Sequence, residues 1–123
     1  MHCNLRITSE CCRALGNFSH YESVQNIFER NGADKILHTL LDSSDINLVV
    51  NVIGIFINFS LRNSTLAVFS GDAGISKLLV AIREFNDWHV SNLTLQLIWN
   101  LLRNTPEVIV ANYDLSLSNF DIF

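Results

Sequence analysis

The stretch LGNFS at residues 15–19 recurs as FINFS at residues 56–60 and as IWNLL at residues 98–102. Intervals of 41 and 42 residues separate the three copies. A second stretch follows the same period, because NGADKIL at residues 31–37 aligns with AGISKLL at residues 73–79. A repeat of roughly 40–47 residues is typical of proteins built from stacked helical units. The internal period therefore predicts a helical repeat array.

The apolar residues around each repeated asparagine have a helical spacing. They stand five and two positions before it and one position after it, which places them on one stripe of an α-helix and excludes the two-residue period of a strand. The predicted buried stripe consists of Cys12, Leu15, Phe18, Ile53, Phe56, Phe59, Leu95, Ile98 and Leu101. Residues 5–19, 46–60 and 87–102 are accordingly predicted to form three long helices.

Two shorter helices are predicted between successive long helices. Residues 23–28 and 64–70 form the first of them in each unit, and residues 33–41 and 75–84 form the second, after a corner that contains glycine. Residues 43–45 and 86–87 offer N-caps for the second and third long helices. Pro106 opens a further short helix at a position that tolerates proline, and the pattern stops after residue 112.

The composition agrees with a helical fold and excludes several functional classes. The 123 residues are 49% hydrophobic and 16% charged, and one proline and five glycines are too few for an all-β sandwich. The net charge is −4 and the eight Lys and Arg residues form no basic run, so neither a nucleic acid nor a membrane surface is expected as a partner. The strongest apolar run, residues 48–59, falls short of the roughly 20 residues that cross a bilayer.

The amino end has no apolar segment of the length that a secretory signal peptide requires. The three cysteines are odd in number, and Cys11 and Cys12 are adjacent, which disfavours a disulfide framework. Both observations predict an intracellular, cytoplasmic protein with reduced thiols.

These features together resemble the armadillo repeat. The unit has about 42 residues in three helices, a Gly-Ala corner before the second helix, and a long third helix that ends in Leu-x-Asn-Leu/Phe. The resemblance implies an all-α, right-handed armadillo-type α-solenoid of about two and a half to three repeats. We place the array at residues 1–112, with partial first and last repeats, and an irregular tail at residues 113–123.

A narrower resemblance covers a shorter part of the chain. IREFNDW at residues 82–88, followed by LIWN at residues 97–100, is similar to armadillo repeat proteins linked to cilia and sperm flagella. It implies a non-enzymatic protein-interaction scaffold in the cytoplasm and in the axoneme of a cilium or flagellum, with a role in axoneme assembly or organisation. The alternative within the family is a nuclear-import-type receptor that binds cargo peptides.

The family resemblance also implies a concave groove that is lined by the third helices and binds other proteins. A repeated asparagine there hydrogen-bonds the backbone of an extended peptide, and the matching residues are Asn17, Asn58 and Asn100. A carboxamide both donates and accepts hydrogen bonds, so it can hold a peptide amide without reading side chains. The alternative interpretation is that each asparagine caps its helix or bonds within its own repeat.

Other residues are assigned to this groove by their register. Import receptors carry a Trp four positions before the asparagine, where this chain has Arg13, Gly54 and Gln96, and this difference disfavours the import function. The face is polar with little net charge, which suits a partner bound by backbone and shape, although an ordinary solvated helix face has the same pattern. The predicted binding residues are Asn17, Asn58, Asn100, Arg13, Asn51 and Gln96, and Arg6, Glu10 and Asn47 extend the same face.

Two further expectations concern the tryptophans and the ends of the array. Trp88 and Trp99 occupy other phases of their helices, and we expect them to be buried between repeats rather than to contact a ligand. The chain begins within a long helix and shows no polar cap at either end, which predicts a slice of a longer array. Uncovered apolar faces at the two uncapped ends of the array predict that the isolated chain is marginally stable or self-associates.

A thiol- or zinc-dependent enzyme is the alternative from a different class. Cys11 or Cys12 could act with His20 as thiol and base, or with His2 and Cys3 as zinc ligands. However, Cys12 lies on the predicted buried stripe, no C-x-x-C spacing occurs, and His20 lies eight residues beyond Cys12, at least two helical turns away. We therefore expect small buried cysteines, no catalytic site, no metal and no cofactor.

Overall fold

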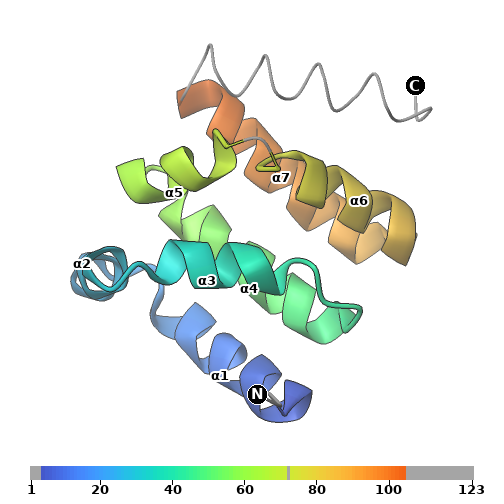
Figure 1. Cartoon of the computed structure of the whole chain (residues 1–123), viewed down its shortest axis with the longest axis horizontal. Helices are drawn as coiled ribbons and strands as arrows, with labels where there is room; N and C mark the ends of the chain where they lie inside the picture. Colours follow the sequence, from blue (N-terminus) through green and yellow to red (C-terminus); the bar gives the residue numbers. More distant parts are fainter. Residues whose placement is uncertain (1–3, 72, 105–123) are drawn as a thin grey trace.

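The computed structural model describes residues 4–71 and 73–104, and this part of the chain consists of helices without strands (Figure 1). The predicted all-α class is confirmed, and each predicted helix between residues 5 and 102 lies within three residues of an observed one. The helices are α1 (Leu5–Phe18), α2 (Glu22–Arg30), α3 (Ala33–Leu40), α4 (Ile46–Phe59), α5 (Asn63–Phe69), α6 (Ser76–Phe85) and α7 (Trp88–Asn104).

The ends of the long helices show why the sequence repeats. Asn4, Asp45 and Asp87 each precede a long helix, and the side-chain oxygen of each accepts hydrogen bonds of 2.9 to 3.4 Å from amides two or three residues ahead. Such N-caps satisfy amides that have no partner inside the helix. At the opposite ends of α1 and α4, the hydroxyls of Ser19 and Ser60 donate to the carbonyl three residues earlier, at 2.8 Å in both. The repeated residues therefore begin and end equivalent helices.

The three long helices form a row. Helix α4 packs against α1 on one side and against α7 on the other, and Figure 1 shows the same order. Helix α3 packs on α4, and α6 packs on α7. Residues 4–71 and 73–104 thus form α1 followed by two three-helix units, α2–α4 and α5–α7, which is the arrangement of an α-solenoid. The right-handed winding stays a prediction.

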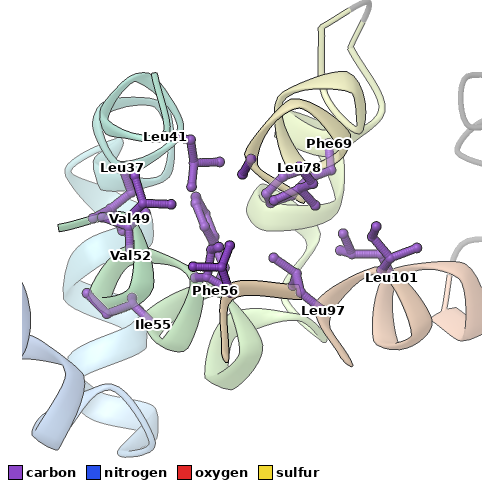
Figure 2. Packing of buried hydrophobic residues seen from close by; sticks show 14 of the residues in the cluster. Leu37, Leu41, Val49, Val52, Ile55, Phe56, Phe69, Leu78, Leu97 and Leu101 are labelled. Atoms are coloured by element: carbon purple, nitrogen blue, oxygen red, sulfur yellow. The ribbon is translucent and has the colours of Figure 1, made fainter. Parts of the chain in front are cut away.

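The core lies between the two units, and Phe56 of α4 is at its centre (Figure 2). Its ring meets the ring of Phe69 from α5 edge to face, with centroids 4.8 Å apart. Such a pair adds to the stabilisation from apolar burial. The surrounding side chains come from α3, α4, α6 and α7: Leu37, Val49, Val52, Ile55, Leu78, Leu97 and Leu101 are all buried.

The two glycine-containing corners solve different local problems. Gly32 precedes α3 with a φ of 66°, in the left-handed region that favours glycine. Gly74, its counterpart in the next unit, is buried, and a Cβ there would overlap the backbone of Phe69. The first corner requires glycine for its left-handed backbone conformation, and the second requires it because a side chain would not fit. Both glycines nevertheless occupy the same position in the repeat.

Four predictions of burial are wrong, and all four fall on the outer long helices. Leu95 and Phe18 are 54% and 55% exposed, whereas their counterparts on α4, Ile53 and Phe59, are buried. Trp88 and Trp99, expected between repeats, are 84% and 65% exposed. In the described part α1 has no long helix before it and α7 has none after it, so these stripes lack the neighbour that covers the equivalent residues of α4.

Most of the remaining predictions about the buried stripe are confirmed. Cys12, Phe56, Ile98 and Leu101 are buried, and Leu15 packs partly buried against the core. Of the predicted array, residues 105–112 lie outside the described residues, as does the predicted tail at residues 113–123.

Candidate protein-binding surface

A hollow of about 660 Å³ lies between the long helices α1 and α4. Five of the nine residues that the sequence assigned to the groove line this hollow, whereas Asn17, Asn58, Asn100 and Gln96 do not. The five are Arg6, Glu10 and Arg13 from α1 and Asn47 and Asn51 from α4, and the remaining lining residues are Leu5, Ser9, Asp45 and Val50. The assignment of these residues to a binding groove stays a prediction.

The hollow is polar and its charges nearly balance. Arg13 donates to one oxygen of Glu10 from Nε and from a terminal nitrogen, at 3.0 and 2.7 Å, and both side chains are mainly exposed. An exposed ion pair of this kind contributes little to stability. Arg6 has no ion-pair partner among the described residues, and Asp45 is engaged as the N-cap of α4. The hollow can therefore accept polar groups from a partner without separating a buried charge pair.

Two of the predicted groove asparagines also hold the long helices together. The Asn51 amide nitrogen donates to the backbone carbonyl of Ser9 at 3.2 Å, and the Asn58 amide nitrogen donates to the hydroxyl of Ser19 at 2.7 Å. Both bonds join α4 to the preceding long helix, the first to Ser9 within α1 and the second to Ser19 just after its end. Neither amide oxygen has a partner among the described residues, so each side chain keeps an acceptor.

The remaining two asparagines of the repeated stretches, Asn17 and Asn100, have different surroundings. Asn17 is exposed, and its side chain forms no hydrogen bond with any described residue. Asn100 is half-buried, and its backbone carbonyl accepts a hydrogen bond of 2.7 Å from the Asn104 amide. Because the side chain of Asn17 is exposed and has no internal bond to lose, its removal tests binding separately from folding.

Gly54 leaves an open notch in the middle of α4. No heavy atom lies within 4 Å of the position that a Cβ would take there. Its register counterparts are Arg13 on α1 and Gln96 on α7, both exposed. A glycine in a helix interior costs roughly 0.8–1.0 kcal/mol relative to alanine. The Gly54 notch therefore leaves open space on α4 at a cost to the stability of this helix.

Polar contacts between the units were not foreseen from the sequence. Thr65 of α5 donates to the buried carboxylate of Asp34 on α3 at 2.7 Å. Lys77 of α6 donates to the carboxylate of Asp42 at 3.0 Å and to the backbone carbonyl of His38 at 3.1 Å. The partners are 31 to 39 residues apart, so no local spacing marks them. These contacts hold the α2–α4 unit against the α5–α7 unit.

Arg62, at the start of α5, makes a further contact of this kind. Its guanidinium donates to Asn26 at 2.7 Å and forms an ion pair with Glu29, both on α2. The pair is only partly exposed, so solvent screens it less than an ion pair on an open helix face. The first helices of the two units are therefore tied by charge as well as by packing.

The thiol that was considered as a nucleophile is poorly suited to the role. Cys12 is buried on α1, and burial, followed by the neighbouring Cys11, raises the pKa of its thiol. A raised pKa lowers the thiolate fraction and hence the reactivity. Cys11 is exposed, and His20 stacks on Tyr21 with ring centroids 4.2 Å apart. His2 and Cys3 lie outside the described residues.

The described residues contain no group of three or more His, Cys, Asp or Glu side chains arranged to hold a metal ion. No helix within residues 4–71 or 73–104 is both long and apolar enough to span a bilayer.

Comparison with known proteins finds one curated relative at a significant level. The chain is similar to "Armadillo repeat-containing protein 2" of Mus musculus, with 26% identity over 103 residues. The match covers 82% of this chain and 12% of the relative, so the chain spans about an eighth of that protein's length. No family model matches, and no solved structure matches. The relative supports the predicted resemblance to armadillo repeat proteins.

Proposed function

We propose that this chain is a non-enzymatic interaction module that binds an extended segment of another protein along its row of long helices. The observation that supports the proposal is the polar hollow between α1 and α4, which is lined by Arg6, Glu10, Arg13, Asn47 and Asn51. The proposed contact residues are Asn17, Asn58, Asn100, Arg13, Asn51 and Gln96.

The chemistry of this surface favours recognition of a peptide backbone. The amide oxygens of Asn51 and Asn58 are free to accept from partner N–H groups, while their nitrogens are used within the fold. Asn17 offers both a donor and an acceptor. The open space at Gly54 then gives one partner side chain a place on α4. Backbone bonds give affinity in this mode, and such a notch gives selectivity.

An import-type receptor for basic peptides fits this surface less well. At the register positions where import receptors place Trp, this chain has Arg13, Gly54 and Gln96. These residues provide no aromatic face for a cation, and Arg13 repels one. A role in the assembly or organisation of a cilium or sperm flagellum is supported by the local resemblance of residues 82–88 and 97–100. We adopt that role as the proposed setting.

Selection from a displayed library of random peptides tests the binding mode. The wild-type chain should enrich peptides that bind in extended form and are not rich in Lys and Arg. Asn17→Ala should weaken their binding, because it removes a free amide and no internal bond. Gly54→Gln should weaken it as well, because it fills the notch with the side chain found at position 96.

Ile36→Glu is the matched control, since Ile36 is exposed on α3 and lies outside the proposed contact residues. The proposal fails if the library yields no binder, or if the binders are basic peptides. It also fails if Asn17→Ala and Gly54→Gln bind the selected peptides as well as wild type does.

The proposed setting has its own test. A fluorescent fusion of the chain, expressed in ciliated cells, should accumulate along the axoneme, and accumulation should fall for the Asn17→Ala, Gly54→Gln double variant. Uniform cytoplasmic fluorescence would contradict the ciliary setting. It would not affect the peptide-binding proposal, which the library selection tests separately.

A further inference from the structure

Arg6 is a cation without a partner in the hollow between α1 and α4. It stands in the first turn of α1 and is exposed, and its guanidinium forms neither a hydrogen bond nor an ion pair with any described residue. A guanidinium carries five N–H donors in a planar fork and keeps its charge at every physiological pH. The hollow therefore presents a set of unused donors that matches the geometry of a carboxylate.

The other three charged groups that line the hollow already have partners inside the protein. Arg13 donates to one oxygen of Glu10 from two nitrogens, at 3.0 and 2.7 Å. Asp45 accepts from two amides at the start of α4, at 2.9 and 3.4 Å, and the positive end of that helix offsets its charge. The first turns of α1 and α4 contain no acidic residue. Among the charged groups of the hollow, only Arg6 lacks a partner in the described part of the chain.

Neutral groups complete the lining of the hollow. Asn47 is exposed on α4, and its side chain forms no hydrogen bond with a described residue, so its amide group can still donate and accept. Leu5 is 49% exposed and Val50 packs partly buried against the core, so both add apolar surface. The volume of about 660 Å³ lies in the range of pockets that hold small ligands, and a few polar groups on an apolar lining orient the ligand in such pockets.

We infer that the hollow binds one side-chain carboxylate of the partner segment, an Asp or Glu, with Arg6 as its counter-charge and Asn47 as a neutral donor. The inference rests on the proposed function and adds to it the type of residue that the partner carries. A bidentate pair between arginine and a carboxylate combines two parallel hydrogen bonds with the attraction of opposite charges. Because solvent reaches Arg6, we expect the pair to discriminate between partners more than to supply most of the affinity.

The charge balance of the hollow favours a carboxylate over a phosphate. A phosphoryl group carries a charge of about −1.5 to −2 at neutral pH, and the hollow has one cation without a partner. The carboxylates of Glu10 and Asp45 line the same hollow and repel any second negative charge. A single Asp or Glu therefore matches Arg6 one to one, whereas a phosphorylated residue or a run of acidic residues does not.

The experiment uses the full chain and the peptides that the library selection yields. These peptides should share an Asp or Glu at one position, and replacing it by Asn or Gln should weaken binding about tenfold, as the loss of one charge-assisted pair requires. Arg6→Gln should weaken the acidic peptide by about the same factor and leave the affinity for its neutral version unchanged. Fluorescence anisotropy with labelled peptides measures all four affinities.

Arg30→Gln is the matched control. Arg30 is also exposed and has no ion-pair partner among the described residues, but it lies on α2, outside the hollow. It should bind both peptides as wild type does. Arg6→Glu should reject the acidic peptide and recover affinity for a peptide with Lys at that position. Neither Arg6 variant removes an internal side-chain bond, so circular dichroism melts should show both to be folded.

Several results would overturn the inference while leaving peptide binding itself intact. Selected peptides might as a group lack a shared acidic position, or the loss on replacing the acid could be the same in wild type and in Arg6→Gln. A requirement for a phosphorylated residue, or a loss of binding when the peptide carboxyl end is amidated, would also contradict a side-chain carboxylate. A library without any binder would overturn the proposed function and this inference together.

Discussion

Replacing Gly54 by alanine should stabilise the protein. Gly54 lies in the interior of α4, and a Cβ added there meets no heavy atom within 4 Å. Alanine in a helix interior is favoured over glycine by roughly 0.8–1.0 kcal/mol, and no clash offsets this difference. We therefore expect Gly54→Ala to raise the free energy of unfolding by about 1 kcal/mol.

The corresponding change in melting temperature follows from the size of the chain. Unfolding entropy is about 2.1 cal/mol/K per residue, which amounts to roughly 0.25 kcal/mol/K for a domain of this length. The melting temperature should accordingly rise by about 4 °C. Thermal melts followed by circular dichroism at 222 nm, which is the helical band, and urea titrations at equal protein concentration both measure it.

Gly74→Ala is the matched control for this prediction. It introduces the same methyl group in a corner where the Cβ would overlap the backbone of Phe69. We expect a clear loss of stability, because a backbone carbonyl cannot move aside as a flexible side chain can. A lower melting temperature for Gly54→Ala would refute the open notch, and an unchanged one for Gly74→Ala would refute the close approach at the corner.

Four other perturbations follow from the packing and the titrating groups. Phe56→Ala should lower the free energy of unfolding by about 3–5 kcal/mol, because the ring is fully buried, and a loss below about 1 kcal/mol in a urea titration would contradict its central place. Thr65→Val leaves the buried Asp34 carboxylate without its 2.7 Å bond and should cost about 1–3 kcal/mol by the same assay, whereas no loss would show that the bond is dispensable. Burial lowers the pKa of His38 below its usual value, so the unfolded chain binds the proton more readily; stability should fall as the pH drops below about 6.5, and His38→Gln should reduce that slope. Equal slopes in melts of the two proteins would exclude His38 as a contributor. Cys12 should react with a thiol reagent only after denaturation, and rapid labelling in the native chain, read by mass spectrometry, would contradict its burial.

The sequence was sufficient to predict the helices because local and long-range signals coincide in it. The caps at Asp45 and Asp87, the corner glycines and the apolar stripe all recur with one period, so each unit confirms the boundaries of the other. The same register placed Arg6, Glu10, Arg13, Asn47 and Asn51 on one face, and these five residues line the hollow between α1 and α4, whereas Asn17 and Asn58 of the same face do not.

The exposure of four residues could not be predicted in this way, namely Phe18, Leu95, Trp88 and Trp99. Periodicity identifies the stripe that an α-helix presents for packing, but it carries no information on whether a neighbour covers that stripe. On α4 both sides are covered, while on α1 and α7 one side is open in the described residues. The wrong predictions therefore fall on the two long helices that have a long helix on one side only in the described residues.

The hydrogen bonds of the groove asparagines also could not be predicted from the sequence. Asn17 and Asn58 are both followed by Phe and Ser, yet the side chain of Asn58 bonds to Ser19 while that of Asn17 bonds to no described residue. The difference arises because α4 has a preceding long helix to bond with and α1 has none among the described residues. A residue type and its register do not decide between a structural role and a binding role when the neighbouring helix supplies the partner.

A partner bound as proposed lies along the row of long helices, across α1, α4 and α7. Nuclear magnetic resonance of the isotope-labelled chain, titrated with a peptide from the library selection, measures where it binds. We expect amide shift changes at Asn17, Gly54 and Gln96, one residue on each long helix, and little change on α2, α5 and the outer face of α3. Shift changes confined to those shorter helices, with none at the three long-helix residues, would contradict it.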